Sequence, residues 1–445
     1  MCACVYSLLL AETMKRCKKL ETHLPDCVIS YIFSNLGLKD LVKTSVLSKR
    51  WLPEWGLRMD LNFDLQNMFD HNTIQNLQES IPLFQSEFAT RLDQFMQHYH
   101  GATIRSIKVK FPLGDDHSYA IDRLISQGIT KGVNRIELLF SYDTDLEMEP
   151  YKFSFTLLSN THSLAHLHLQ NCRIVAPMDF SGFKNLRTLV FHVVRVTQDI
   201  LHGLFSNCIH LADFTLDDCQ FNSDLKIISP TLFHLNIVNC WVDYWPKNID
   251  IVTSNLTSIE YSCNGSDVHS MNIKAHMLSK FSFRGCQIPC QIPEHFEFSG
   301  LKNVTTVVLD GIHLSCIQND VLPLLFSECL QLEDVTFKNC KIVLDLKIIS
   351  PKLRHLKIFD CGDRDIFPWR VIIDALNLLS FEFSCNIGKF FSVNAPRLSK
   401  VFWNAARREK NPPLFGPIAT LQHIEILAMI LNFSQVSHSK PMFAC

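Results

Sequence analysis

The side chains best suited to metal binding or proton transfer in this sequence are histidines. His166 and His168 alternate with leucines, so both would lie on one face of a single strand, and His192 would follow on the same face one segment later. Neighbouring imidazoles can hold a metal ion, but solvated or partner-contacting histidines are commoner at such positions. We therefore predict no metal site from these three residues.

The 17 cysteines form no recognisable zinc or disulfide framework. Cys286 and Cys290 are four residues apart, but no second pair with zinc-finger spacing follows them. Several cysteines instead end a repeated apolar pattern, where a small buried side chain would turn the chain out of a strand: Cys172, Cys219, Cys240, Cys286, Cys340 and Cys361. We expect these residues to be packed, reduced thiols without a catalytic role.

The sequence lacks the motifs of the common catalytic sites. It contains no glycine-rich phosphate loop, no nucleophile motif and no paired metal motif. The formal net charge is −2 and charged residues make up 19% of the chain, which does not indicate a basic nucleic-acid-binding surface. We therefore predict a non-catalytic protein with no cofactor, no metal and no nucleic-acid partner.

The segment before residue 60 predicts three short helices that cannot form a stable core alone. Pro25 suits the first turn of one helix and Gly37 suits its end, and apolar residues recur between them at helical spacing. A second helix restarts after Gly37, and a third segment runs from Ser48 to Trp55. A unit this small, without a disulfide or metal, needs the rest of the chain or a partner to cover its apolar face.

This segment resembles the F-box motif. The match runs from about Leu20 to Trp55 and includes Leu24-Pro25-Asp26, Lys39-Asp40-Leu41-Val42 and Ser48-Lys49-Arg50-Trp51. The resemblance implies docking onto a Skp-type adaptor, which in turn binds a cullin. It assigns the docking contacts to the following residues: Leu24, Pro25, Ile29, Ile32, Leu41, Val42, Val46, Leu47 and Trp51.

One apolar pattern repeats along the rest of the chain. Leu164, Leu167, Leu169 and Cys172 show it clearly, and successive copies up to Leu421 begin about 23 residues apart on average, which is typical of leucine-rich repeats. Each repeat would supply one short parallel strand and a connector. Because no repeat can bury its apolar face alone, neighbouring repeats are expected to stack into a curved solenoid.

A larger duplication contains several of these repeats. The segment from Leu204 to Cys240 is matched by the segment from Leu325 to Cys361, at an offset of about 121 residues. We infer that five repeats were copied as a block, at about 186–300 and 304–420. The phrase that begins at Leu204, Leu-Phe-Ser-Asn-Cys, resembles the repeats of plant F-box/leucine-rich-repeat proteins.

The predicted fold class is α/β, with an N-terminal three-helix F-box followed by a curved leucine-rich-repeat solenoid that has one parallel strand per repeat. We divide the chain into an N-terminal extension (1–19), an F-box domain (20–60), a helical linker (61–103) and the solenoid (104–445). Met1 or Met14 is the expected start. Because no segment predicts a signal peptide or a membrane helix, we expect a location in the cytoplasm and/or the nucleus, without a membrane partner.

The resemblance implies a substrate-recognition adaptor of an SCF-type (Skp-cullin-F-box) ubiquitin ligase. Two alternatives stay open: a small-molecule-dependent co-receptor of the same ligase class, and an interaction scaffold that does not lead to ubiquitination. In each case the partner would bind the concave strand face, where Lys280 and Arg284 form the one close basic pair. The repeat phase places these candidate contacts there: His166, His168, Asp213, Asp217, His234, Glu260, Lys280, Arg284, Lys357 and Phe359.

Overall fold

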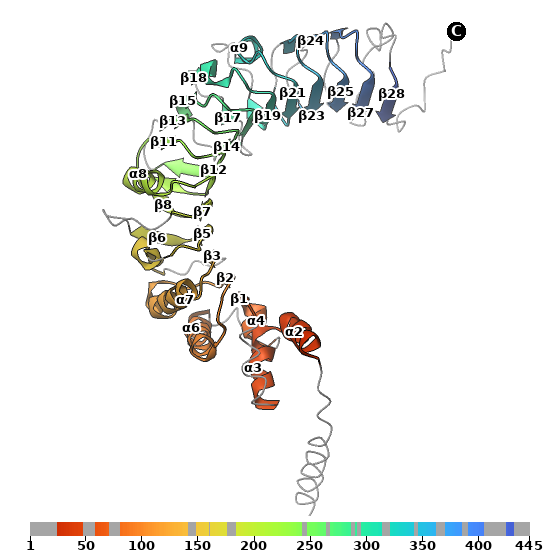
Figure 1. Ribbon diagram of the computed structural model, residues 1–445. Helices are drawn as coiled ribbons and strands as arrows, with labels where there is room; N and C mark the ends of the chain where they lie inside the picture. The colour runs from red at the N-terminus through yellow and green to blue at the C-terminus, as the bar shows by residue number, and fades with distance from the viewer. Residues whose placement is uncertain are drawn as a thin grey trace, which may run out of the picture.

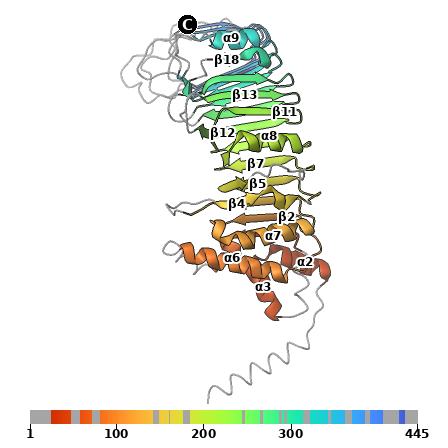
Figure 2. The same cartoon turned by 90° about the vertical axis from the view of Figure 1, so that its left-hand side faces the viewer.

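The protein is a long curved solenoid with a small helical unit at its N-terminal end (Figures 1 and 2). The computed structural model describes residues 25–47, 58–70, 81–140, 148–159, 161–175, 184–242, 247–263, 268–285, 290–291, 295–313, 321–341, 346–361, 370–384, 390–404 and 424–430. The predicted α/β solenoid with one parallel strand per repeat is confirmed.

The N-terminal unit consists of helices α2 (Asp26–Asn35) and α3 (Leu38–Leu47). Pro25 precedes the first helix, as its fixed φ and missing N–H favour. Phe33 and Leu38 are buried and belong to the same apolar core as the first strands of the solenoid. The predicted third segment, Ser48 to Trp55, lies outside the described residues.

The concave side of the solenoid is one parallel sheet, whose strands follow one another in register along the arc (Figure 1). In spatial order its main strands are β1 (Asp60–Asp64), β2 (Ser106–Lys110), β3 (Arg135–Leu139), β5 (His166–Gln170), β7 (Thr188–His192), β9 (Asp213–Asp217), β12 (His234–Val242), β14 (Ser258–Cys263), β16 (Lys280–Arg284), β19 (Thr306–Asp310), β21 (Asp334–Lys338), β23 (His355–Phe359), β25 (Ser380–Ser384), β27 (Lys400–Asn404) and β28 (Ile426–Ile430).

The convex side is built from helices and short outer strands (Figures 1 and 2). The helices are α4 (Leu65–Met68), which links the N-terminal unit to the sheet, and α6 (Ile81–His98), α7 (Ser118–Thr130), α8 (Gln198–Asn207) and α9 (Val321–Glu328), with 3-10 turns at Asp115–His117, Phe155–Leu158 and Phe298–Leu301. The remaining strands are β4 (Tyr151–Ser154), β6 (Cys172–Val175), β8 (Arg195–Val196), β10 (Gln220–Phe221), β11 (Leu225–Ser229), β13 (Lys247–Thr253), β15 (Val268–Lys274), β17 (Cys290–Gln291), β18 (His295–Glu297), β20 (Ile312–His313), β22 (Leu346–Ile349), β24 (Arg370–Asp374) and β26 (Phe390–Asn394).

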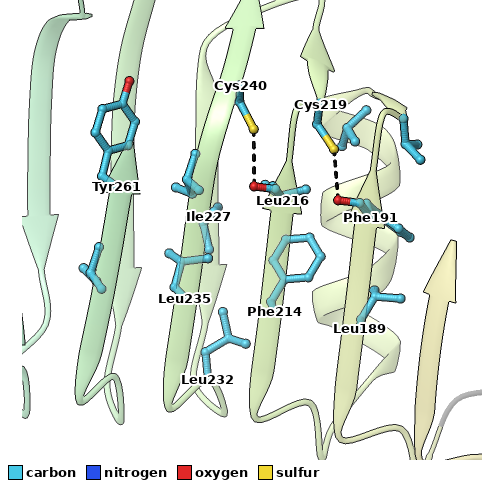
Figure 3. Packing of buried hydrophobic residues seen from close by; sticks show 14 of the residues in the cluster. Leu189, Phe191, Phe214, Leu216, Cys219, Ile227, Leu232, Leu235, Cys240 and Tyr261 are labelled. Atoms are coloured by element: carbon cyan, nitrogen blue, oxygen red, sulfur yellow. Dashed lines mark hydrogen bonds between the residues drawn. The ribbon is translucent and has the colours of Figure 1, made fainter. Parts of the chain in front are cut away.

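The core lies between the concave sheet and the convex layer. Alternate residues of each concave strand point into it, so that Leu189 and Phe191 of β7 and Phe214 and Leu216 of β9 are buried (Figure 3). Phe191 and Phe214 meet edge-to-face, with ring centroids 5.8 Å apart. The core is therefore continuous along the array, because each repeat covers the apolar edge of the one before it.

A left-handed residue ends many of the concave strands. Its backbone N–H donates to a strand carbonyl of the next repeat, as from Asn171 to the His192 carbonyl at 2.9 Å. The non-glycine residues with this conformation have φ between 49° and 53°: Asn171, Val193, Asp218, Asn239, Asn339 and Asp360. Asparagine and aspartate tolerate it, but the β-branched Val193 does not adopt it without strain.

The cysteines that follow these turns are buried, as the repeat pattern predicts. The Cys219 thiol donates to the Phe191 carbonyl at 3.3 Å and the Cys240 thiol to the Leu216 carbonyl at 3.4 Å (Figure 3). These thiols therefore satisfy carbonyl groups of the preceding repeat. Cys172, Cys340 and Cys361 are also buried free thiols, whereas Cys286 lies outside the described residues.

Two expectations from the sequence need correction. Cys263 is disulfide-bonded, although the spacing of the cysteines in the sequence indicates no disulfide framework. The predicted helical linker (61–103) contains β1, which pairs in parallel with β2 and makes the sheet begin before residue 104. Leu61 and Phe63 fill its two buried positions, and so short an alternation without a neighbouring repeat gives little sequence signal.

The strain at Val193 generates a stability prediction. Val193→Asn keeps the backbone hydrogen bond to Asp217 and removes an exposed β-branched side chain from a left-handed position. We expect the free energy of unfolding to rise by about 1 kcal/mol, measured as a higher midpoint of thermal unfolding. Val175 is a similarly exposed valine with ordinary φ, so Val175→Asn should bring no gain. Equal effects of the two substitutions would contradict the strain argument.

Candidate functional site

Helices α2 and α3 present an exposed apolar surface, here called the helical face. Val28, Tyr31, Ile32 and Val42 have exposed fractions of 38%, 73%, 41% and 41%. Tyr31 and Ile32 follow Val28 by three and four positions, so both lie beside it on one face of α2. Large apolar side chains gathered at a surface indicate a protein-binding site.

The predicted docking contacts have different places in the structure. Pro25, Ile32 and Val42 are exposed, as a contact residue must be. The prediction of direct contact is wrong for Leu41, which is fully buried beside Leu38 in the core. That contact was implied by the resemblance to the F-box motif, and a motif match does not tell whether an apolar residue faces the partner or the core of its own chain. The others lie outside the described residues or side chains: Leu24, Ile29, Val46, Leu47 and Trp51.

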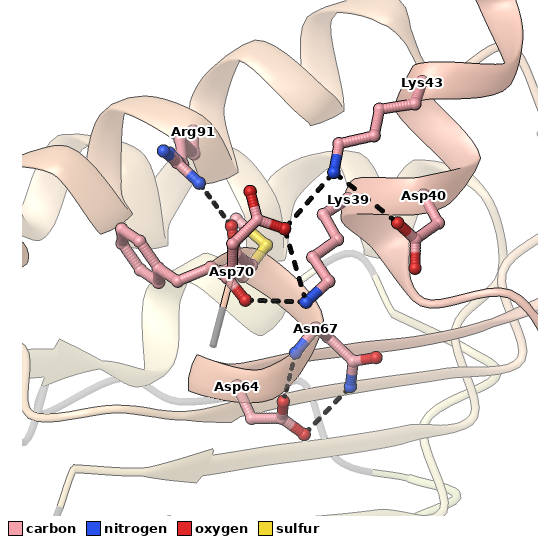
Figure 4. A network of polar contacts seen from close by, with 9 residues as sticks. Lys39, Asp40, Lys43, Asp64, Asn67, Asp70 and Arg91 are labelled. Carbon is pink, nitrogen blue, oxygen red and sulfur yellow. Dashed lines mark hydrogen bonds and ion pairs between the residues drawn. The ribbon is translucent and has the colours of Figure 1, made fainter. Parts of the chain in front are cut away.

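Polar contacts attach α3 to the segment that follows β1 (Figure 4). Lys39 donates to the Phe69 carbonyl at 2.8 Å, and Lys43 binds the Asp70 carboxylate at 3.2 Å. The hydrogen bond from Lys43 lowers the pKa of Asp70 below its usual value. Because both partners of the Lys43–Asp70 pair are exposed, the pair contributes little to stability, and the backbone contact of the half-buried Lys39 is the stronger anchor.

Two arginines make further contacts between the helices and the solenoid. Arg58, just before β1, donates to the Leu36 carbonyl at the end of α2. Arg91 of α6 donates to the Met68 carbonyl of α4 and stacks over the Phe69 ring at 4.4 Å. Together with the shared apolar core, these contacts hold the helical face in a fixed orientation to the concave sheet.

The in-register pairing of the concave strands arranges their outward side chains in three rows. Residues one, three and five of each strand lie on the concave side, away from the core, and each lies beside its counterpart on the next strand. Asp213 thus lies beside His234 in the first row, and Asp217 lies in the third row. All ten candidate contacts predicted from the sequence lie on these rows.

A charged cluster surrounds His166 and His168. On the neighbouring strand Glu137, 6% exposed, accepts hydrogen bonds from Arg135 and pairs with Lys108 at 3.0 Å. Burial opposes the ionised form, but these cationic partners still hold the pKa of Glu137 below its usual value. The sequence reasoning missed this group because its two repeats, beginning near Ile104 and Val133, follow the pattern loosely.

The two histidines of this cluster are neutral near pH 7. Burial lowers the pKa of His168 to about 4, with Glu137 opposing the shift. Burial and the Arg135 charge lower the pKa of His166. The Nε2 atoms of both rings are buried without a hydrogen-bond partner among the described residues. Within those residues, no group of three potential ligands could hold a metal ion.

Other candidate residues lie close to carboxylate or cationic side chains on neighbouring strands. His192 lies 3.8 Å from Asp217 and His234 lies 3.9 Å from Asp213. The chain continues this alternation further along the arc, with Arg284 bound to Glu260 at 3.0 Å and Lys357 bound to Glu382 at 2.8 Å. Phe359 is half-buried in the third row. The face therefore carries charges of both signs, which suits a protein or peptide partner.

Lys280 and Arg284 do not converge on a common point. They are the first and fifth residues of β16, which separates their backbones by about 13 Å. Arg284 is occupied by Glu260, whereas Lys280 has no ion pair among the described residues. The basic pair predicted from the sequence therefore does not form the compact cationic pocket that a small anionic ligand would require.

No helix in the described part of the chain is long and apolar enough to cross a membrane.

Comparisons with known proteins match both parts of the chain. The family model described as At1g61320/AtMIF1, LRR domain matches residues 95–283 and 277–408, and the F-box domain model matches residues 22–52. The Arabidopsis thaliana protein At1g61330, named as FBD-associated F-box protein, is 26% identical over 78% of this chain and 70% of its own length.

Two further relatives and one solved structure complete these findings. The Arabidopsis thaliana F-box/FBD/LRR-repeat protein At1g13570 is 24% identical over 78% of this chain and 81% of its own length. The F-box/LRR-repeat protein 13 of Arabidopsis thaliana is 26% identical over 48% of this chain, which spans 45% of that relative. CroV588, a circular LRR protein, is similar with a TM-score of 0.42 at 13% identity, over 75% of this chain and 50% of CroV588.

The lowered pKa of His168 predicts a specific contribution to acid sensitivity. Folding disfavours protonation of His168. Its neutral form therefore costs no stability above the unfolded pKa of about 6.5, and the free energy of unfolding falls as the pH drops from there towards about 4. His168→Gln removes the group that must be protonated. We expect the acid-induced decrease in the free energy of unfolding to be smaller in this variant by about 1–2 kcal/mol, allowing for partial solvent screening. Thermal unfolding midpoints of both proteins at pH 7 and pH 4.5 measure it. An identical pH-dependent loss in both proteins would contradict the prediction.

Proposed function

This chain belongs to the plant F-box/leucine-rich-repeat proteins, and from that premise we propose that it is the substrate-recognition subunit of an SCF-type E3 ubiquitin ligase. An F-box next to leucine-rich repeats supports an adaptor role in general, and the family is usually non-catalytic. In this proposal the helical face docks on a Skp-type adaptor, the adaptor binds a cullin, and the concave face selects the protein to be ubiquitinated. We place this assembly in the cytoplasm and/or the nucleus.

The observation that carries the proposal is the exposed helical face within the region matched by the F-box model. Val28, Ile32 and Val42 leave a large apolar area in water, which costs free energy unless a partner covers it. Leu41 and Phe33, directly beneath this surface in the same helices, anchor it to the core. The exposed residues are therefore held in place by buried neighbours while their outer side remains accessible to a partner, as a docking face requires.

The concave face supports the second half of the proposal. Many of its outward side chains are charged and of both signs, and several lie in ion pairs that a partner could exchange for its own charges. The co-receptor alternative draws no support from the separated Lys280 and Arg284. The scaffold alternative shares the docking step and differs only in whether a bound protein becomes ubiquitinated.

Docking predicts that truncating the helical face abolishes co-purification with a Skp-type adaptor. Val28→Ala with Ile32→Ala removes apolar contact area without touching the buried residues below. We expect the affinity for the adaptor to fall at least about tenfold, since each methylene-sized group that the partner no longer buries costs about 0.8 kcal/mol. Co-expression with the adaptor followed by calorimetry of the purified proteins measures it.

A matched control uses two isoleucines on the convex strands β11 and β22. Ile228 and Ile349 are 53% and 59% exposed and lie far along the chain from the helical face. Ile228→Ala with Ile349→Ala should leave adaptor binding unchanged. Adaptor binding that survives the Val28/Ile32 substitutions in a folded protein would refute the docking face.

A ubiquitin-transfer assay separates the ligase subunit from the scaffold. The chain is reconstituted with adaptor, cullin, RING subunit, E1, E2 and ubiquitin, and a protein bound to the concave face is followed by electrophoresis. We expect the bound protein to be ubiquitinated, and the Val28/Ile32 variant to prevent this. If the protein still bound the concave face but was not ubiquitinated in the complete reconstituted complex, the scaffold alternative would be favoured.

A further inference from the structure

The duplicated block gives the concave face an identical first row twice. On the strands of each block, the residue in the first position is outward-facing and in register with its neighbours. The first copy reads Thr188, Asp213, His234, Ser258 and Lys280, and the second copy reads Thr306, Asp334, His355, Ser380 and Lys400. All ten residues are at least partly exposed, so a polar surface five strands wide occurs twice along the array.

Packing does not explain this identity. Of the ten pairs of buried positions on the same strands, only Leu235/Leu356 and Ile237/Ile358 keep the same residue, while pairs such as Phe214/Val335 differ. The other two outward rows are kept only in part: the third row differs at four of five pairs, as Asp217/Lys338 shows, and the second row differs at two, Asn236/Lys357 and Ser282/Phe402. The outer strands β11 and β22 also share a sequence, but they pack on helices α8 and α9. The first row is exposed and still unchanged, which indicates that its chemistry is used.

The charges of this row are available to a partner. Lys280, Asp334 and Lys400 form no ion pair among the described residues. Asp213 is engaged weakly, by the Thr188 hydroxyl at 3.4 Å and by His234 at 3.9 Å. Each copy therefore offers one carboxylate and one ammonium group, separated by three strand spacings, or about 14 Å.

The two copies are related by displacement along the solenoid. Every strand is parallel to the next and the order of the five residues is the same, so both copies have the same orientation. A twofold-symmetric dimer would present its two surfaces in opposite orientations. The matching partner is instead one chain that carries the same charged motif twice in tandem.

We propose that the concave face is bivalent and binds an extended segment in which a basic and an acidic residue recur with the spacing of the two copies. Five strand spacings amount to about 24 Å, which an extended chain spans in about seven residues. The basic residue pairs with Asp213 or Asp334, and the acidic residue, about four positions later, pairs with Lys280 or Lys400. This inference rests on the proposed function only in assigning partner recognition to the concave face.

Calorimetry with synthetic peptides tests the proposal on the full-length chain. The single-motif peptide has one lysine and one glutamate four positions apart, with serine and threonine elsewhere, and the double-motif peptide repeats this unit after seven residues. We expect two single-motif peptides per protein but one double-motif peptide, which binds at least about tenfold more tightly because its second contact is intramolecular. A stoichiometry of one for the single-motif peptide, or no measurable binding of either peptide, would overturn the proposal.

Variants of each copy locate the two sites. Asp213→Asn with Lys280→Met, or Asp334→Asn with Lys400→Met, should each reduce the single-motif stoichiometry from two to one. Each should also lower the affinity for the double-motif peptide about tenfold. The matched control removes one exposed carboxylate and one exposed ammonium group on the convex side, Asp199→Asn on α8 with Lys226→Met on β11, and should alter neither result. If the control variant lost peptide stoichiometry and affinity to the same extent, binding would depend on the overall charge of the protein, and the proposal of two sites in the first row would be refuted.

Failure of this proposal is distinguishable from failure of the proposed function. The Val28/Ile32 variant should bind both peptides as the unaltered protein does, because the helical face is separate from the duplicated strands. Adaptor docking without peptide bivalency would overturn the inference alone. Peptide bivalency without adaptor docking would overturn the proposed ligase role and leave the bivalent face standing.

Discussion

The structure depends on one constraint: no repeat of this chain can satisfy its own backbone or bury its own apolar side chains. Each concave strand pairs in register with the next, and the continuous core forms only because neighbours cover one another. The same register aligns the outward side chains in rows. The rows on which recognition is proposed to take place are therefore a direct consequence of the interaction that makes the protein stable.

The turns show how closely stability and the position of the rows are connected. The left-handed residue after a strand donates its backbone N–H to a carbonyl of the next repeat. A buried thiol, such as that of Cys219 or Cys240, donates to a carbonyl of the preceding repeat. Adjacent repeats are thereby joined at the end of the strand as well as along it. Strain at Val193 is tolerated because both hydrogen-bonding and packing neighbours hold that turn in place.

The sequence predicted those features that follow from local periodicity. Apolar spacing identified the repeats, and its phase placed His166, His168 and their counterparts on the concave rows. The ion pair between Glu137 and Lys108 joins residues 29 positions apart in sequence, so no local pattern could reveal it. Leu41 and the short strand β1 were misassigned for a similar reason, since burial and strand pairing depend on the neighbours that tertiary structure supplies.

The joint between the helical face and the solenoid determines what an adaptor built this way can do. Arg58 and Lys39 bind backbone carbonyls on the opposite side of this joint, and both sides share one apolar core. Such a joint resists bending more than exposed ion pairs alone would, because the apolar core holds it and the partly buried polar contacts are screened less by solvent. A protein held on the concave rows is thus kept at a fixed place relative to the docking end. Two equivalent binding sets along one rigid arc would then hold a tandem partner along its length, so that its orientation as well as its position is determined.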